Sequence, residues 1–250
     1  MLESFYDQLS PYYKYIFQDW NASVDRQATI LDEVIREYFG ESVRSILDAA
    51  CGIGTQTIGL AQKGYKLTAS DISSGEIGKA ELEASKRNQD ITFRVADMRN
   101  LQQPFQTKFD LVIACDNAVP HLLSDDEICQ AFGQFYQVTS ESGGCIISVR
   151  DYEAMERGGK KLYPRQVHDV PQGKIVVFDC WEFDGDFYDI TMYIVEDTGQ
   201  AVAKTHVIRG GRYYCISISK LETLMREAGF KTVITLKDRF YQPLLIGLKV

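Results

Sequence analysis

The sequence predicts an α/β fold, namely a doubly wound, Rossmann-like sheet of seven strands into which an antiparallel β cap is inserted. Three observations support this prediction. Short apolar runs alternate with helical segments between residues 41 and 151, which is typical of a parallel sheet. A glycine turn joins the first of these runs directly to a helix. From residue 152 to residue 214 the alternation is replaced by β-branched and aromatic runs, and it resumes over residues 215–250.

Residues 1–40 are predicted to form a helical segment that precedes the sheet. Its first part, residues 5–16, is aromatic-rich and amphipathic, with an interruption at Pro11. A second helix is predicted over residues 22–39, because apolar residues recur at helical spacing and Gly40 follows as a stop signal.

The core of the fold is predicted from residues 41–151 and 215–250. Apolar runs locate its strands, and serine caps and helical periodicity locate its helices. The strands are expected at about residues 43–48, 67–71, 91–95, 110–115, 145–149, 231–237 and 244–250, and the helices at about residues 55–63, 74–88, 125–138 and 219–228.

Residues 152–214 are expected to form an antiparallel cap over the ligand crevice. The runs 174–183 and 187–195 are joined by an Asp-Gly-Asp connection, which is typical of a hairpin. Residues 201–208 are expected to add a third strand, and the polar residues 158–161 are expected to form a flexible link.

Composition and charge exclude several classes of protein. The chain has 45% hydrophobic residues, enough for a full core, and no run approaches the ~20 apolar residues of a membrane span. A net charge of −8 disfavours a nucleic-acid partner, because phosphate contacts require a basic face. We see no secretion signal and no Cys-x-x-Cys spacing, so we expect reduced thiols, a cytoplasmic location and no metal site. Composition leaves the choice between monomer and homo-oligomer open.

The turn after the first strand carries the most specific signal in the chain. Gly52 and Gly54 form a Gly-x-Gly turn, which brings backbone N–H groups and a helix N-terminus close to a ligand. Thr57 stands where the dinucleotide fingerprint has its third glycine, and this weakens an NAD interpretation. Asp48 suits a ligand with a positive charge, such as an ammonium or a sulfonium. Asp71 ends the next strand, at the distance where an acidic residue binds ribose hydroxyls.

Further candidate residues follow the carboxyl ends of the predicted parallel strands, where open α/β sheets bind their ligands. We therefore expect these residues to converge on one crevice. For Asp97 the alternative is a cap over the following turn. The strand-end candidates are Ala50, Cys51, Gly52, Ile53, Gly54, Asp71, Asp97, Met98, Cys115, Asp116, Asn117, Arg150 and Asp151.

The segment LDAACGIGTQ resembles motif I of the class I S-adenosylmethionine-dependent methyltransferases. The segments CDNAVPHL, SVRDYE and RYYCIS resemble the glycine/sarcosine N-methyltransferases, and YYKYIFQDWNASVDRQ is similar to the N-terminal segment that covers their cofactor. The resemblance implies S-adenosyl-L-methionine as cofactor, with S-adenosyl-L-homocysteine as product. It also implies cofactor contacts from Tyr13, Trp20, Arg26, Asp48, Ala50, Gly52, Gly54, Asp71, Asp97, Met98 and Cys115.

Four residues are candidates for holding the methyl acceptor. Arg150 presents a planar fork that binds a carboxylate bidentately, and the alternative is an ion pair with Asp116, Asp151 or Glu153. Asn117 accepts from an amine or orients a carboxylate, or is an ordinary turn residue. Tyr213 and Tyr214 suit a small polar pocket, or pack as an aromatic pair. His121 is a proton acceptor or a hydrogen-bonded structural histidine.

These observations predict an N-methyltransferase that acts on a small amino acid such as glycine or sarcosine by in-line displacement. The alternatives are a methyltransferase for another small amine, thiol or carboxylate, an NAD-dependent oxidoreductase, a nucleic-acid methyltransferase, and a non-catalytic protein that binds the cofactor. The sequence DNAV after the fourth strand lacks the Asn/Asp-Pro-Pro-aromatic pattern of many nucleic-acid methyltransferases. We therefore expect a small-molecule acceptor, with no nucleic acid and no membrane as partner.

Overall fold

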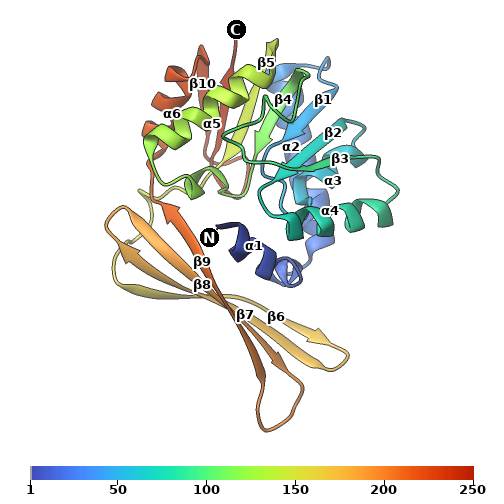
Figure 1. Ribbon diagram of the computed structural model, residues 1–250, viewed down its shortest axis with the longest axis vertical. Coiled ribbons are helices and arrows are strands. Elements are labelled where there is room, and N and C mark those ends of the chain that lie inside the picture. The colour runs from blue at the N-terminus through green and yellow to red at the C-terminus, as the bar shows by residue number, and fades with distance from the viewer. Residues whose placement is uncertain (1) are drawn as a thin grey trace.

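The computed structural model describes residues 2–250, and its core is a seven-stranded sheet with the order β10-β11-β5-β4-β1-β2-β3 (Figure 1). The strands β1 to β5 are parallel, and β11 runs antiparallel to both β5 and β10. The predicted α/β class is confirmed. The strands are β1 Ser45–Asp48, β2 Lys66–Asp71, β3 Thr92–Val95, β4 Phe109–Ala114, β5 Thr139–Ser148, β10 Thr232–Leu236 and β11 Leu244–Leu248.

Five α-helices follow or precede these strands, and four of them begin at a polar cap. The side chains of Asp19, Ser73, Ser124 and Ser217 each accept a backbone N–H of the first turn, which satisfies a donor that the helix leaves free. Within residues 2–250 no helix has the length and apolar character needed to span a membrane. The helices are α2 Trp20–Phe39, α3 Thr55–Gln62, α4 Ser74–Lys86, α5 Asp125–Val138 and α6 Ile218–Glu227, with a short 3₁₀ turn η2 at Val119–His121.

Both faces of the core sheet are buried. Ile46 and Leu111 pack in one cluster with Leu31 of α2, whereas Leu47 packs in another cluster with Phe132 of α5. Successive residues of a strand point to opposite faces, so a sheet covered on both sides requires near-continuous apolar strands. This explains why the central strands are read from the sequence as unbroken apolar runs.

The cap is a second, four-stranded antiparallel sheet that projects from the core (Figure 1). It has one strand more than the sequence predicts, because residues 160–170 form a strand that begins within the expected link at residues 158–161. This strand lies at the edge of the sheet and contains Pro164. Many of its residues are polar, so its hydrophobic pattern is weak. The cap strands are β6 Lys160–Val170, β7 Gly173–Asp184, β8 Phe187–Asp197 and β9 Lys204–Tyr214.

The N-terminal segment lies between the core and the cap (Figure 1). It forms two short helices, α1 Leu2–Leu9 and η1 Tyr13–Ile16, on either side of Pro11, as the interruption at this proline predicts. Phe5 is buried against Gly211 of β9, where an added Cβ would lie 3.1 Å from the phenylalanine ring. A glycine at this position therefore lets α1 lie directly on the cap sheet.

The contact between α2 and α3 gives a first testable prediction. A Cβ at Gly59 would lie 2.6 Å from Ala28 Cβ and 2.7 Å from the Val24 carbonyl oxygen, so the helices must separate to accept it. We expect Gly59→Ala to lower the free energy of unfolding by about 1–3 kcal/mol. Gly78→Ala is the matched control, because nothing lies within 4 Å of that helical position. Urea unfolding should show it to be stabilised by roughly 0.5–1 kcal/mol; equal effects at both glycines would contradict the close crossing.

Candidate functional site

A cavity of about 330 Å³ lies at the carboxyl ends of β1, β2 and β4, against the N-terminal segment. Seven of the predicted cofactor residues line it: Tyr13, Ala50, Gly52, Asp71, Asp97, Met98 and Cys115. The other lining residues are Leu2, Glu3, Tyr6, Ala49, Cys51, Ile53, Thr55, Gln56, Ile72, Ala96, Arg99, Asp116, Ala118, His121, Leu122, Leu123 and Glu127.

The glycine turn forms one wall of this cavity. Gly52 and Gly54 have φ angles of +52° and +88°, a region that residues with a Cβ rarely adopt. The N–H of Gly52 donates to Asp71 Oδ2 at 2.9 Å, and the N–H of Ser73 donates to Asp71 Oδ1 at 3.0 Å. The carboxylate of Asp71 is therefore held in one orientation at the cavity wall, with lone pairs on both oxygens left for a ligand.

Asp48 lies beneath the turn and does not line the cavity. It is 1% exposed, accepts the Thr57 hydroxyl at 2.6 Å and accepts the Ala50 N–H at 3.3 Å. Thr57 occupies the position of the missing third glycine, so its hydroxyl fixes the carboxylate that supports the turn. Burial raises the pKa of Asp48 to about 7, against the lowering effect of these two hydrogen bonds.

Glu76 is a second buried carboxyl group below the turn. Its side chain is fully buried, and neither oxygen has a hydrogen-bond partner among residues 2–250. Ser73 and Glu76 have the spacing of a capping box, but Asp71 takes the Ser73 N–H that the glutamate would otherwise accept. Burial and the nearby charge of Asp71 raise the pKa of Glu76 well above its usual range.

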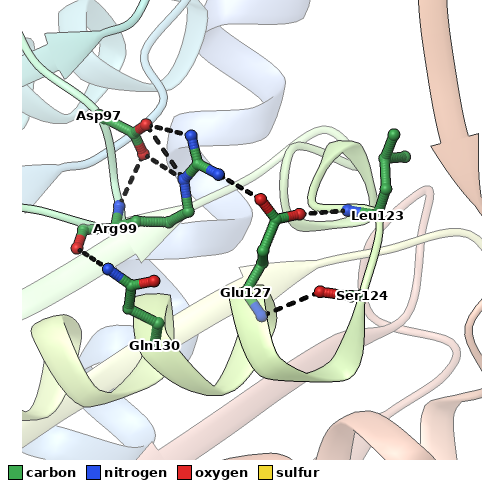
Figure 2. Close-up of polar contacts among 6 residues, drawn as sticks. All are labelled: Asp97, Arg99, Leu123, Ser124, Glu127 and Gln130. Atoms are coloured by element: carbon green, nitrogen blue, oxygen red, sulfur yellow. Dashed lines mark hydrogen bonds and ion pairs between the residues drawn. The ribbon is translucent and has the colours of Figure 1, made fainter.

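Part of the cavity lining is a network of polar and charged groups, whose contacts Figure 2 shows. Arg99 donates to both oxygens of Asp97, with an Nη2–Oδ2 distance of 2.6 Å, and also pairs with Glu127. Glu127 in turn accepts the Leu123 N–H at 3.0 Å. The Asp97 carboxylate also accepts the Arg99 N–H at 2.8 Å, so it caps the following turn while it lines the cavity. Burial alone raises the pKa of Asp97, but Arg99 outweighs this effect and lowers it.

The N-terminal segment meets the cavity through Tyr6 and Tyr13. The Tyr6 hydroxyl lies 2.6 Å from His121 Nε2, and His121 Nδ1 lies 2.9 Å from the Arg212 carbonyl oxygen. Because a carbonyl oxygen only accepts, Nδ1 carries the proton and Nε2 accepts from Tyr6. Burial lowers the pKa of His121 to about 3, so the imidazole is neutral and acts as a structural hydrogen-bonding group.

Asn117 fixes the chain around Arg150 rather than lining the cavity. Its Oδ1 accepts the Arg150 N–H at 3.0 Å, and its Nδ2 donates to the Tyr152 hydroxyl at 2.7 Å. Asp116 and Asn117 both have positive φ angles, of 56° and 64°. Two consecutive non-glycine residues in this region store backbone strain, which is typical of functional sites.

The guanidinium of Arg150 lies within an aromatic group contributed by the cap. It donates to the Tyr188 hydroxyl at 2.9 Å, and it lies 5.1 Å from the Trp181 ring centre and 5.6 Å from that of Tyr213. The alternative ion pairs with Asp116, Asp151 or Glu153 are not formed, because among residues 2–250 no carboxylate lies within 4.0 Å of this guanidinium.

Tyr213 connects this aromatic group to the cavity wall. Its hydroxyl lies 3.4 Å from that of Tyr6, and its ring lies 3.8 Å from that of His121. On its other side Tyr213 stacks on Tyr188 at 4.9 Å. Arg150 is therefore one aromatic layer beyond the residues that line the cavity.

Besides Asn117, Arg150 and Tyr213, five predicted site residues lie outside the cavity. Asp48 and Gly54 support the turn, and Gly54 is the cap of α3. Trp20 is buried and donates to the Thr55 hydroxyl at 2.9 Å. Arg26 is exposed and contacts Ser23. Tyr214 donates to Asp125 at 3.1 Å, away from Tyr213.

The sequence interpretation missed several residues of the site, notably Tyr6, Arg99 and Glu127. Arg99 lies two residues after the predicted Asp97, so the sequence shows that the two are close, but it does not show the ion pair of Arg99 with Glu127 of α5. The Asp116-Asn117 pair carries a usable signal, because Asp and Asn tolerate left-handed backbone after a strand.

Comparison with known proteins places this geometry among methyltransferases. Residues 46–143 match the sequence family described as a methyltransferase domain. The glycine/sarcosine N-methyltransferase of Parasynechococcus marenigrum (strain WH8102) is 27% identical over 224 residues, which cover 88% of this chain and 73% of that protein.

Solved structures share the whole architecture. DesVI of Streptomyces venezuelae superposes with a TM-score of 0.80 at 18% identity, over 98% of both chains. CalS10 of Micromonospora echinaspora, an amino pentose methyltransferase solved with bound S-adenosylmethionine, gives a TM-score of 0.79 at 14% identity, over 95% of this chain and 94% of that chain. At these identities the likeness establishes the fold.

The buried Asp48 gives a testable pH dependence. Its pKa is about 7 in the folded chain against 3.8 without burial, so the folded state holds the proton that the unfolded state has lost. The stability that this group contributes should therefore fall by about 2 kcal/mol as the pH rises from 5 to 7, out of roughly 4 kcal/mol for the whole pKa difference. The Asp48→Asn variant keeps the shape and lacks the titration. Urea unfolding from pH 5 to pH 8 should show that the free energy of unfolding of Asp48→Asn increases relative to that of the unmodified chain as the pH rises. The same pH dependence in both proteins would contradict the raised pKa.

Proposed function

Because the chain is an S-adenosylmethionine-dependent methyltransferase of the class I fold, we propose that it methylates the nitrogen of a small amino acid such as glycine or sarcosine. The relative from Parasynechococcus marenigrum is named for this reaction, and its similarity extends over most of the chain. The observation that carries the proposal is the half-buried guanidinium of Arg150, which has aromatic neighbours and no carboxylate partner among residues 2–250.

The cavity residues fit the cofactor. Asp71 presents carboxylate lone pairs for ribose hydroxyls, and the turn at Gly52 brings backbone groups close to the nucleoside. Asp97 and Met98 would flank the adenine, with Arg99 holding the Asp97 carboxylate in place. When bound, S-adenosylmethionine supplies a methyl group on a positively charged sulfur and leaves as S-adenosylhomocysteine.

An acceptor carboxylate is the natural partner of Arg150. A guanidinium offers parallel N–H donors that match a carboxylate, and such charge-assisted pairs are the strong ones in a water-poor site. A charged group that is half-buried without a counter-ion is uncommon, because desolvation is costly. A carboxylate at Arg150 would direct the amine of a short amino acid back towards Tyr213 and Tyr6, which lead to the cavity.

The proposed chemistry is a direct displacement. The lone pair of the neutral amine forms the new N–C bond while the C–S bond breaks and its electron pair stays on sulfur, and the amine then releases a proton. Alignment supplies most of the acceleration, since positioning contributes roughly 7–11 kcal/mol in well-oriented reactions. His121 has a pKa of about 3 and stays neutral, so the ammonium form of the acceptor loses its proton before binding in the reactive orientation.

A second candidate is a methyltransferase for another small amine. CalS10 acts on an amino pentose and shares the fold of the whole chain. An amino sugar has no carboxylate, so it would leave Arg150 unpaired. The two candidates therefore differ in whether the acceptor needs a carboxylate.

The test of the proposal is a substrate panel that measures S-adenosylhomocysteine release. We expect turnover with glycine, sarcosine or both, and none with their amides, because an amide removes the negative charge that Arg150 would bind. Amino sugars, thiols and carboxylates without an amine complete the panel. Turnover with an amino sugar and with no amino acid would refute the proposed acceptor and leave the methyltransferase assignment intact.

Arg150 variants test the acceptor site directly. Arg150→Ala should raise the KM for the acceptor roughly 100-fold, and Arg150→Lys roughly tenfold or more, because lysine keeps the charge and loses the bidentate geometry. The Kd of S-adenosylmethionine should change little in either variant. Arg209→Ala, an exposed arginine of β9, is the matched control. Equal effects on acceptor and cofactor would contradict the carboxylate role.

Asp71 variants test the cofactor site. Asp71→Ala removes the proposed ribose acceptor and the partner of the Gly52 N–H, so we expect the Kd of S-adenosylhomocysteine to rise at least roughly 100-fold. Isothermal titration calorimetry measures the change. Asp90→Ala, an exposed carboxylate between α4 and β3, should bind normally. An unchanged Kd for Asp71→Ala would remove the ribose assignment.

A further inference from the structure

The cap contains an ion pair between a half-buried arginine and a fully buried carboxylate, which the proposed reaction does not yet use. Asp179 of β7 is 0% exposed, and Arg165 of β6 donates to its Oδ2 through Nε at 2.6 Å and contacts it through a second nitrogen. The indole N–H of Trp181 donates to the same oxygen at 3.3 Å. The other carboxylate oxygen of Asp179 has no hydrogen-bond partner among residues 2–250.

The backbone of β6 is built to bring Arg165 to this place. Pro164 pairs with Phe178 and Gln166 pairs with Val177, so Arg165 is the extra residue of a β-bulge. A bulge redirects one side chain without changing the rest of the strand, and bulges are frequent beside active sites. Here the redirected side chain reaches Asp179.

Trp181 connects the ion pair to the proposed acceptor site. Its ring stacks on Tyr188 at 4.4 Å with an interplanar angle of 17°, and Tyr188 stacks on Tyr213 at 4.9 Å. The guanidinium of Arg150 lies 5.1 Å from the Trp181 ring centre and donates to the Tyr188 hydroxyl. The orientation of the indole therefore sets the surface against which Arg150 rests.

A buried ion pair is a weak source of stability, because removing two charges from water costs about as much as their attraction returns. Apolar residues of similar volume would fill the same space at no loss. An ion pair at this position, with one oxygen left unsatisfied, therefore points to a role in geometry. The feature that it controls is the single hydrogen bond of the Trp181 indole.

We propose that Arg165 and Asp179 are positioning residues for acceptor recognition, which fix the Trp181 indole and thereby hold Arg150 in the orientation that binds the acceptor carboxylate. This inference rests on the proposed function and extends it. It makes the cap, rather than the core alone, the part of the protein that selects a carboxylate-bearing acceptor. The proposed ribose partner Asp71 and the turn at Gly52 make none of these contacts, so cofactor binding should change little.

The first test replaces the ion pair with apolar residues in the double variant Arg165→Met/Asp179→Leu. We expect the KM for the amino-acid acceptor to rise roughly tenfold, with the Kd of S-adenosylhomocysteine within about twofold of the unmodified value. The midpoint of urea unfolding should be unchanged or higher. A lower unfolding midpoint with an unchanged KM would overturn the inference, because it is the result of a purely structural ion pair.

Trp181→Phe tests the same path by a second route, and it removes only the indole N–H and part of the ring. Its KM for the acceptor should rise similarly, and combining it with the double variant should add little, because both act through one hydrogen bond. If the KM increases of Trp181→Phe and of the double variant multiplied when the substitutions were combined, the path through Trp181 would be overturned. This variant also carries the test if the double variant fails to fold.

The matched control is Lys160→Gln/Glu182→Gln. This ion pair joins the same two strands at 2.9 Å, but its side chains are 72% and 49% exposed, and Glu182 follows Trp181 directly on the opposite face of the strand. The acceptor KM should not change. An equal rise in KM would mean that any change in these strands disturbs the site, and it would overturn the specific role of Arg165 and Asp179.

A readout that needs no substrate separates this inference from the proposed function. Phenylglyoxal modifies accessible guanidinium groups, and mass spectrometry of the peptide that contains Arg150 measures the rate. We expect Arg150 to react several-fold faster in Trp181→Phe and in the double variant than in the unmodified chain. If no amino acid is methylated, the proposed function fails, while faster labelling still supports the control of Arg150. Unchanged labelling overturns the inference.

Discussion

The hydrogen bond between the Gly52 N–H and the Asp71 carboxylate is the interaction on which the site depends. It joins the ends of β1 and β2, which are parallel neighbours in register, and it requires the chain to turn back immediately after β1. The turn requires a φ angle of +52° at residue 52, which glycine adopts without a steric penalty. The bond fixes both the backbone of the turn and the orientation of the carboxylate. The core therefore forms this wall of the cavity without help from the N-terminal segment or the cap.

The N-terminal segment links the two sheets over this cavity. Tyr6 contacts His121, next to the core, and Tyr12 contacts His206 and Glu196 of the cap. Asp7 accepts the Ser73 hydroxyl and the Gly75 N–H at the start of α4. The segment makes these contacts through its side chains, and from Leu2 onward it pairs with neither sheet as a strand. The position of the cap relative to the core is thus set partly by short helices that also cover the site.

The parts of the fold that follow local rules were predictable from the sequence. The strand, glycine turn and helix around Gly52 follow from backbone conformation, and Asp71 follows from its distance along the chain. The edge strand β6 was missed because its pattern is polar and interrupted by a proline. The aromatic surroundings of Arg150 come from cap strands more than thirty residues later, and only packing brings them there. Trp20 and Arg26 were expected at the cofactor by resemblance, but one supports Thr55 and the other is exposed.

The distribution of charge explains how such a site can order two ligands. Carboxyl groups gather under and around the first turn, where burial raises the pKa of Asp48, Asp71 and Glu76. Burying these groups costs stability, and a positively charged ligand beside them recovers part of that cost by favouring the ionised forms. Arg150 has the opposite charge and lies on the cap side, one aromatic layer away. For the proposed reaction, a cationic methyl donor is favoured at the core and an anionic acceptor group at the cap. The same polarity disfavours each ligand in the other's place, so it fixes the direction in which the acceptor nitrogen approaches the methyl group.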